Sequence, residues 1–285
     1  MALDRRRHRP QNHPVARNEG LYLTSWLADE PQGVLAIVHG YGEHIGRYQD
    51  FASWLATHGW TVVAGDLPGH GRSPGRRGHI ASFSQYLEAV ARLLEAAEDQ
   101  SPGKPVLLGH SLGGLITARY AELSPDSLAG LILSSPFLGL APPVPGWKRG
   151  LARLLSRLWP GFSLPSGIEP RFLSHDPRVV AAYRDDSLVH HVATARWFQE
   201  TLAAQAAALR DAGSIRVPVL IIQGEEDHLA RVSATREFAT RCGSEDITLR
   251  LYPGLYHELL NELGREAIWA EVLGWLEAHR EAGSD

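Results

Sequence analysis

Cysteine and lysine are scarce in this 285-residue chain, and each shortage excludes something. Cys242 is the only cysteine, so the chain cannot form an intramolecular disulfide. That usage fits a reducing compartment, and we expect a cytoplasmic protein. Lysine occurs only at Lys104 and Lys148, so the lysine enrichment typical of thermophiles is missing.

Long apolar runs and a strong charge imbalance are also lacking. No apolar run approaches the length of a membrane span, and the net charge of −4 gives no sign of a nucleic-acid partner. The N-terminus is basic over Asp4–Pro10 but lacks the apolar stretch of a signal peptide. It is either an electrostatic arm or an untethered end. We favour the second interpretation and expect residues 1–18 to form a flexible extension.

Short apolar runs alternate with helical patterns from about residue 20 to residue 135. This alternation predicts an α/β protein with a mainly parallel central sheet flanked by helices. Helices are expected over Leu115–Glu122 and Glu258–Arg280, and periodic apolar residues predict two more, over 48–58 and 86–94. The expected strands are Gly33–His39, Trp60–Asp66, Pro105–Gly109, Leu128–Ser134, Val217–Gln223 and Ile247–Tyr252.

The alternation breaks over residues 136–214, which hold several prolines and amphipathic stretches but no convincing strand. We therefore expect one α/β core, residues 1–135 and 215–285, interrupted by a helical cap or lid over residues 136–214. Within the insertion, Trp147–Trp159 carries leucines on one face and arginines on another. Such a basic amphipathic helix either lies on a lipid surface or packs its leucines on the core.

A candidate nucleophile lies in Gly109-His110-Ser111-Leu112-Gly113, which matches the G-x-S-x-G pattern. An apolar strand precedes it and a helix follows, and this context predicts the nucleophile elbow of the α/β-hydrolase fold. Gly109 and Gly113 are needed because a side chain there would collide with the neighbouring strand or helix. The backbone N–H of Leu112, the residue after the nucleophile, is one expected oxyanion donor. The alternative is a glycine-rich helix start with an incidental serine.

A serine hydroxyl needs a base and an orienting acid, and in this fold they follow it in the order acid, then histidine. Asp227 comes just after the Val217–Gln223 strand, and His257 just after the Ile247–Tyr252 strand. Both lie at carboxyl ends of strands, where such sheets place their sites. Glu225 or Glu226 could replace Asp227 as the acid. The other histidines in strand-end loops, none of which precedes the terminal helix, are His39, His70 and His110.

The loop after the Gly33–His39 strand reads HGYGEHIGRY and resembles the HGxGEHxxRY signature of the monoacylglycerol lipase family, which includes lysophospholipase-like α/β-hydrolases. The stretches DLPGHGRSPGRRG (66–78), GHSLGG (109–114) and YPGLYHELLNE (252–262) resemble further motifs of that family. The resemblance implies that Tyr41 supplies the second oxyanion N–H. It also implies that Glu43 and Arg47 lie near the glycerol hydroxyls, and Tyr183 near the leaving group. Glu43 and Arg47, four residues apart, could instead form an exposed pair with each other.

The sequence thus predicts a serine hydrolase that cleaves monoacylglycerols or similar single-chain esters without a cofactor or a metal ion. Lysophospholipase, carboxylesterase, thioesterase or aminopeptidase activity on the same scaffold is the nearest alternative, and a non-catalytic binding protein is a more distant one. A transient contact of the helix at 147–159 with a membrane surface is expected. The adjacent His190 and His191 are expected to be solvent-exposed rather than metal ligands.

Overall fold

The central sheet of the protein is described by a computed structural model that covers residues 13–14, 20–100, 103–141 and 143–280. Eight strands form it in the order β1-β2-β4-β3-β5-β6-β9-β10. Strand β2 pairs antiparallel with β1 and β4, and the other neighbours are parallel. The strands are β1 (His13–Pro14), β2 (Leu23–Trp26), β3 (Gly33–Val38), β4 (Trp60–Gly65), β5 (Val106–His110), β6 (Gly130–Ser134), β9 (Val219–Gly224) and β10 (Ile247–Tyr252).

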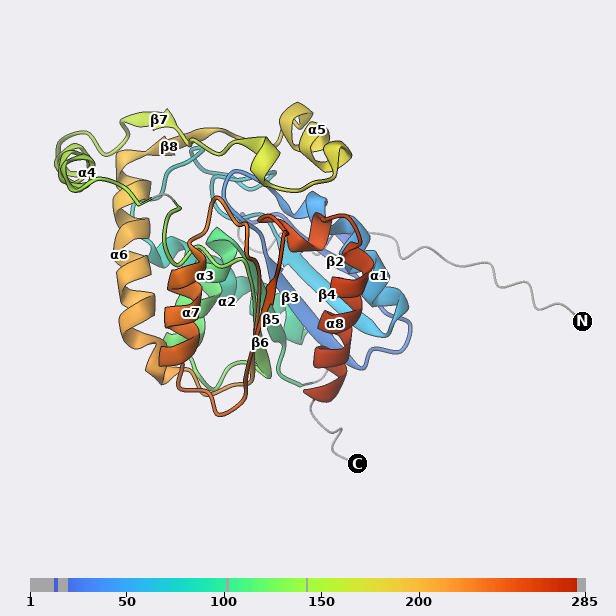
Figure 1. Ribbon diagram of the computed structural model, residues 1–285. Helices are drawn as coiled ribbons and strands as arrows, with labels where there is room; N and C mark the ends of the chain where they lie inside the picture. Colours follow the sequence, from blue (N-terminus) through green and yellow to red (C-terminus); the bar gives the residue numbers. More distant parts are fainter. Residues whose placement is uncertain (1–12, 15–19, 101–102, 142, 281–285) are drawn as a thin grey trace, which may run out of the picture.

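Helices cover both faces of this sheet (Figure 1). Alternate residues of β3 show why, because Val34, Ala36 and Val38 belong to one buried apolar cluster and Leu35 and Ile37 to another. A strand buried on both faces reads as a continuous apolar run, as predicted. One cluster is covered by α2 (Ser84–Glu98), α3 (Leu112–Leu123), α6 (Ala195–Asp211) and α7 (Val232–Arg241), and the other by α1 (Gln49–Thr57) and α8 (Arg265–Ala278). The α/β-hydrolase fold is therefore confirmed.

Two expectations about helices and strands were wrong. The helix expected over Glu258–Arg280 is interrupted, because Gly264 adopts φ = +76° between the short 3-10 helix η4 (Leu259–Asn261) and α8. The 136–214 segment does contain strands, since β7 (Ser163–Pro165) pairs antiparallel with β8 (Val192–Thr194). Three-residue strands are too short to show a periodic pattern, and their pairing joins distant parts of the segment.

The 136–214 segment forms a layer above one end of the sheet, from which α6 runs down the flank of the core (Figure 1). The layer also contains α4 (Gly146–Leu158), α5 (Pro177–Asp185) and the 3-10 helix η2 (Pro170–Phe172). The 3-10 helix η3 (Ala212–Ser214) follows the far end of α6 and lies beside α3 and α7. Near the N-terminus, strand β1 pairs with β2. The other residues of the 1–18 extension lie outside the described residues.

Strand β8 and the segment just before it are hydrogen-bonded to two loops of the core. The backbone N–H of His190 donates to Gly42 O at 2.9 Å, and that of Thr194 donates to Gly78 O at 2.9 Å. Gly42 and Gly78 have φ of +78° and +64°. A Cβ atom at Gly42 would lie 2.7 Å from His190 O, and one at Gly78 would lie 2.0 Å from Val192 O. Both positions are glycine because the backbone of His190 approaches Gly42 closely and that of β8 approaches Gly78 closely.

Candidate active site

Ser111 lies at the sharp turn between β5 and α3. Its φ of +52° is in a region that residues other than glycine rarely adopt, which indicates a strained turn. A Cβ atom at Gly109 would lie 2.3 Å from Gly113 O, and one at Gly113 would lie 2.1 Å from Val38 O on β3. The predicted need for both glycines is confirmed, because helix α3 starts against β5 and β3 with no room for side chains.

His257 and Asp227 are brought together from loops that follow β10 and β9. His257 Nδ1 lies 2.8 Å from Asp227 Oδ2. The second oxygen of Asp227 accepts from the backbone N–H groups of Leu229 and Ala230, each at 2.9 Å. A Cβ atom at Gly224 would lie 2.2 Å from Leu255 O, so the end of β9 passes directly under the histidine loop.

The two alternative acids point elsewhere. Glu225 and Glu226 are exposed, and the Glu225 carboxylate accepts from Arg236 at 3.1 Å. Asp227, by contrast, is buried and also accepts from the side-chain amide of Gln223 at 2.9 Å. Among the three carboxylates of this loop, the structure therefore pairs only Asp227 with the histidine.

The surroundings of Asp227 and His257 shift the pKa values of both side chains. Burial alone would raise the pKa of Asp227, but the nearby His257 and the two backbone N–H donors hold it below its ordinary value. Burial alone would lower the pKa of His257, but the Asp227 carboxylate, followed by Glu258 and Glu43, raises it above its ordinary value. An imidazole of this kind accepts a proton readily, which is what a general base must do.

Gly40 and Tyr41 lie beside Ser111 on the loop that follows β3. A Cβ atom at Gly40 would lie 3.1 Å from the Ser111 Cβ, so this backbone runs directly past the serine. Leu112 is the first residue of α3, where backbone N–H groups have no partner within the helix. The N–H groups of Tyr41 and Leu112 therefore belong to the two backbone segments that flank the serine.

Glu43 and Arg47 pair as expected, but they are buried rather than exposed. Arg47 Nη1 lies 2.5 Å from Glu43 Oε2, with side-chain exposures of 9% and 4%. The burial results from a third partner, Glu258, whose two oxygens accept from Arg47 Nη1 at 2.6 Å and Nη2 at 2.7 Å. Glu258 was missed from the sequence, where its position directly after His257 was the available signal. Tyr183 packs its ring 4.9 Å from the Arg47 guanidinium carbon.

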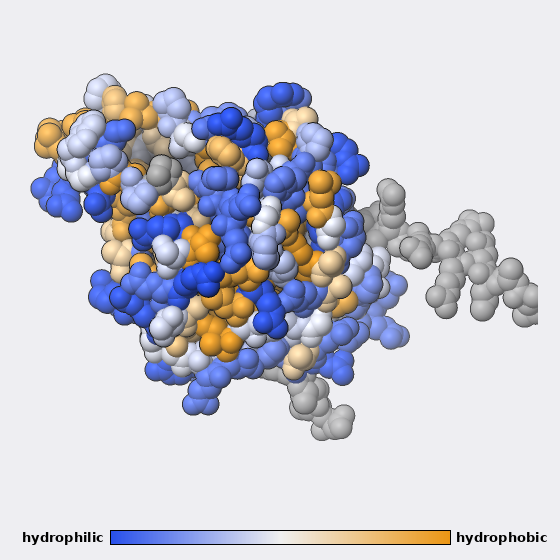
Figure 2. All heavy atoms as spheres, in the orientation of Figure 1, coloured by the Kyte–Doolittle hydropathy of each residue, from blue (hydrophilic) through white to orange (hydrophobic). Residues whose placement is uncertain are grey.

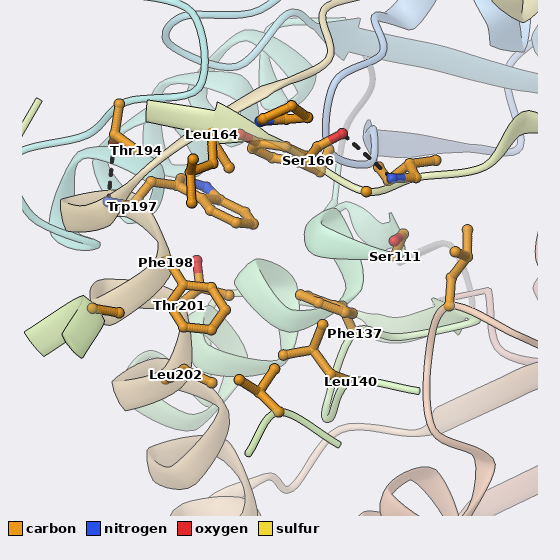
Figure 3. A pocket seen from close by; sticks show the side chains of 18 of the residues that line it. Ser111, Phe137, Leu140, Leu164, Ser166, Thr194, Trp197, Phe198, Thr201 and Leu202 are labelled. Atoms are coloured by element: carbon orange, nitrogen blue, oxygen red, sulfur yellow. Dashed lines mark hydrogen bonds between the residues drawn. The ribbon is translucent and has the colours of Figure 1, made fainter. Parts of the chain in front are cut away.

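An apolar pocket of about 580 Å³ is lined by Ser111, His257 and the carboxylates of Glu43 and Glu258. Figure 3 shows Ser111 on one side of it, with Trp197, Phe198, Thr201 and Leu202 of α6 facing it from the other. His110, whose ring centre lies 4.9 Å from that of His257, also lines the pocket. Burial lowers the pKa of His110 to about 4, so this imidazole is neutral near pH 7. The polar end of the pocket is lined by Glu43, Tyr183, His257 and Glu258.

The adjacent histidines of the 136–214 segment do not behave as expected. His191 is exposed, but His190 is buried, because it packs against Tyr41 with ring centres 5.2 Å apart. Within the described part of the chain, no group of three or more His, Cys, Asp or Glu side chains is placed to hold a metal ion. No helix in the same part is both long and apolar enough to cross a membrane.

Known proteins resemble this chain in sequence and in fold. The profile of the family described as serine aminopeptidase, S33, matches residues 29–264. A monoacylglycerol lipase of Mycolicibacterium smegmatis is 34% identical over 257 residues, which are 89% of this chain and 91% of that protein. The chain belongs to the monoacylglycerol lipase family of α/β-hydrolases.

Two further relatives support this family membership. The human monoglyceride lipase is 32% identical over 268 residues, covering 92% of this chain and 88% of that protein. The crystal structure of the Paleococcus ferrophilus monoacylglycerol lipase superposes with a TM-score of 0.84 at 35% identity, over 91% of this chain and 99% of that one. The family resemblance predicted from the motifs is therefore confirmed, and the chain is a serine hydrolase by family and fold.

Proposed function

We propose that this hydrolase cleaves monoacylglycerols to fatty acid and glycerol through an acyl-enzyme on Ser111. The observation that carries the proposal is the apolar pocket of about 580 Å³ that opens on Ser111 and His257. A pocket of this size lies within the range of about 300–1,000 Å³ that binds small molecules. Its apolar walls suit a single acyl chain, and its polar end suits the alcohol that leaves.

The chemistry follows from the placement of the residues. Ser111 attacks the ester carbonyl while His257 takes its proton, and Asp227 keeps the imidazole oriented and stabilises its charged form. The backbone N–H groups of Tyr41 and Leu112 stabilise the negative oxygen of the tetrahedral intermediate. His257 then gives its proton to the leaving alcohol, and it activates a water molecule that releases the fatty acid.

The charges at the polar end favour an uncharged alcohol such as glycerol. Glu43 and Glu258 line this end, and the Arg47 guanidinium beside them is already bound by both carboxylates. An anionic phosphate, as in a lysophospholipid, would be repelled there. Tyr183 is buried, and its hydroxyl has no hydrogen-bond partner among the described residues, so it is available to a glycerol hydroxyl. Glu43 and Tyr183 are thus the proposed substrate contacts, with Arg47 behind Glu43.

We further propose that the 136–214 segment acts as a cap and that α4 is its contact with lipid. The apolar side chains of α4 and its C-cap are unusually exposed: Trp147 at 68%, Leu154 at 53%, Leu158 at 76% and Trp159 at 63%. In Figure 2 apolar and hydrophilic atoms lie intermixed at the corner that α4 and β7 occupy. Basic side chains beside apolar ones are typical of helices that lie on anionic membranes. The expected cytoplasmic location stays a prediction.

A hydrolysis panel tests the proposed substrate. It would compare long-chain monoacylglycerol, diacylglycerol, lysophosphatidylcholine, an acyl thioester, an aminoacyl amide and p-nitrophenyl butyrate, with S111A as the blank. We expect the highest kcat/KM for monoacylglycerol. A preference for the lysophospholipid, the thioester or the amide would replace the proposed substrate. If the wild type reacts with neither the esters nor a fluorophosphonate probe, the chain is a binding protein on this scaffold.

A further inference from the structure

Glu43, Arg47 and Glu258 form a buried ionic cluster that joins two separate parts of the active site. Glu43 and Arg47 belong to the region after β3, and Glu258 follows β10. Strands β5, β6 and β9 lie between β3 and β10 in the sheet. At about 4.8 Å per strand, the two strands are roughly 19 Å apart. The loops at their ends thus start from well-separated strands and are joined by the side chains of Arg47 and Glu258.

The cluster forms a continuous series of short contacts between the two loops. Glu43 Oε1 accepts from the backbone N–H of Gly40 at 2.6 Å and from the hydroxyl of Tyr48 at 2.8 Å. The other oxygen of Glu43 binds Arg47, which in turn binds both oxygens of Glu258. This series of contacts thus starts at Gly40, one residue before Tyr41, and ends at Glu258, one residue after His257.

Most of the acceptor capacity of the two carboxylates is used inside the cluster, which leaves about one of the roughly four lone-pair sites of Glu43 for a glycerol hydroxyl. Three donors occupy Glu43, and Glu258 accepts from Arg47 twice and from the amide of Asn261 at 3.1 Å. The side chains of Arg47, Glu43 and Glu258 are 9%, 4% and 4% exposed. Burying three charges is costly unless each is well paired, and a planar guanidinium gripped by two carboxylates is among the most rigid ways to pair them.

We propose that Arg47 and Glu258 are positioning residues for catalysis. By holding Glu43 and Glu258 on one guanidinium, Arg47 fixes the oxyanion loop of Gly40 and Tyr41 relative to the loop that carries His257. Oxyanion donors and base must be placed correctly at the same time, and a displacement of about 1 Å can cost about 100-fold in rate. This inference rests on the proposed function, because it concerns the same ester hydrolysis.

The cluster also acts electrostatically on His257. Asp227, followed by Glu258 and Glu43, raises the pKa of His257 against the effect of burial. Removing the charge of Glu258 should lower that pKa. Removing the charge of Arg47 leaves both carboxylates uncompensated, and this should raise the pKa further. Two variants in one cluster are thus expected to shift the pH profile in opposite directions, which a general loss of packing would not do.

The chain provides a matched control in a second buried arginine with two carboxylate partners. Arg119 contacts Glu122, and its Nη1 lies 2.9 Å from Asp211 Oδ2. This group joins α3 to the end of α6, and none of its residues lines the pocket. R119M should lower the melting temperature but leave kcat per folded molecule and the pH profile as in the wild type.

The test measures kcat, KM and the acid limb of kcat/KM with p-nitrophenyl butyrate for R47M, R47K, E258Q and R119M, with melting temperatures alongside. We expect kcat to fall about 100-fold in R47M with KM nearly unchanged, and less in R47K, which keeps the charge but loses the planar fork. The acid limb should move to higher pH in R47M and to lower pH in E258Q. E258Q retains the Glu43–Arg47 pair and can be measured even if R47M does not fold.

Three results would overturn the inference. A rise in KM at constant kcat would make Arg47 a substrate ligand. Losses in R47M and E258Q that only track the folded fraction, as in R119M, would leave the cluster a purely structural role. Acid limbs that move in the same direction would exclude the electrostatic effect on His257. If the wild type cleaves the short ester but not monoacylglycerol, the proposed substrate is wrong while the positioning inference stands.

Discussion

The exposed leucines of α4 allow a direct test of lipid docking. Leu154 and Leu158 are 53% and 76% exposed and do not line the pocket. Because burying a whole leucine side chain contributes about 1.5–3 kcal/mol, covering these exposed fractions contributes about 2–4 kcal/mol in total. At about 1.4 kcal/mol per factor of ten, L154S/L158S should bind anionic vesicles between roughly 30-fold and several hundredfold more weakly than the wild type.

The assay combines vesicle cosedimentation with two rates of hydrolysis. Long-chain monoacylglycerol presented in anionic vesicles should be cleaved more slowly by L154S/L158S, whereas soluble p-nitrophenyl butyrate should be cleaved as before. Added salt should reproduce part of this loss in the wild type, because it screens the basic side chains of α4 from the headgroups. The matched control is L123S, since Leu123 is 60% exposed at the far end of α3 from Ser111.

Two other leucines of α4 separate docking from substrate binding. Leu151 and Leu155 line the pocket, so L151S/L155S should impair long-chain substrates whether or not a vesicle is present. The docking hypothesis is refuted if L154S/L158S binds vesicles like the wild type. It is also refuted if this variant loses activity on both substrates together with a lower melting temperature, because the leucines would then stabilise the fold.

Further predictions concern the catalytic residues, the turn and the pH dependence. S111A, H257A and D227N should each reduce kcat by about 10⁴–10⁶ without adding up in combination, and E226Q should stay within tenfold of the wild type. G113A should lower the free energy of unfolding in urea by about 1–3 kcal/mol, because the added methyl group would lie 2.1 Å from a carbonyl oxygen of β3; an unchanged midpoint would contradict this. The pKa of His257 is raised, and only the neutral imidazole acts as a base, so kcat/KM should fall as the pH is lowered, with the midpoint of the fall above about pH 6.5. A lower midpoint would count against the pairing of His257 with Asp227. Dialysis against EDTA should leave the rate unchanged, and a loss restored by zinc would overturn the mechanism.

Much of the sheet could be predicted because its strands are buried on both faces. The six predicted strands agree with the structure to within two residues at each end, and β10 agrees at both. Strand β2 was not predicted, although it is fully buried, because a four-residue segment with two polar side chains gives no clear apolar run. The pair of β7 and β8 could not be predicted for a related reason. Each strand has only three residues, and it forms because it pairs with residues far away in the sequence.

The site shows the same division between local pattern and distant contact. The order of Ser111, Asp227 and His257 along the chain, each after a strand, was enough to predict that they lie at one edge of the sheet. The structure pairs Asp227 with His257, and Ser111 and His257 line the same pocket. The pairing of Glu43 with Arg47 was also readable from their spacing, but its burial was not. The partner that buries the pair, Glu258, is 211 residues from Arg47 in sequence. An acidic residue next to a histidine is usually a surface charge, so its position alone does not reveal the contact.

The close contacts of residues 190–194 with the loops of Gly42 and Gly78 limit how far the 136–214 segment can be exchanged as a module. A chimera that replaces residues 136–214 with the corresponding segment of a relative would keep Gly42 and Gly78 from this chain, and the new segment would have to run within the same close distance of both. It would also have to provide the carbonyl of Val192, which accepts from the hydroxyl of Tyr41 at 2.5 Å. Grafts of this segment should therefore also carry the two loops that contain these glycines. A library that varies α4 alone leaves these contacts intact and is the safer way to alter chain-length preference.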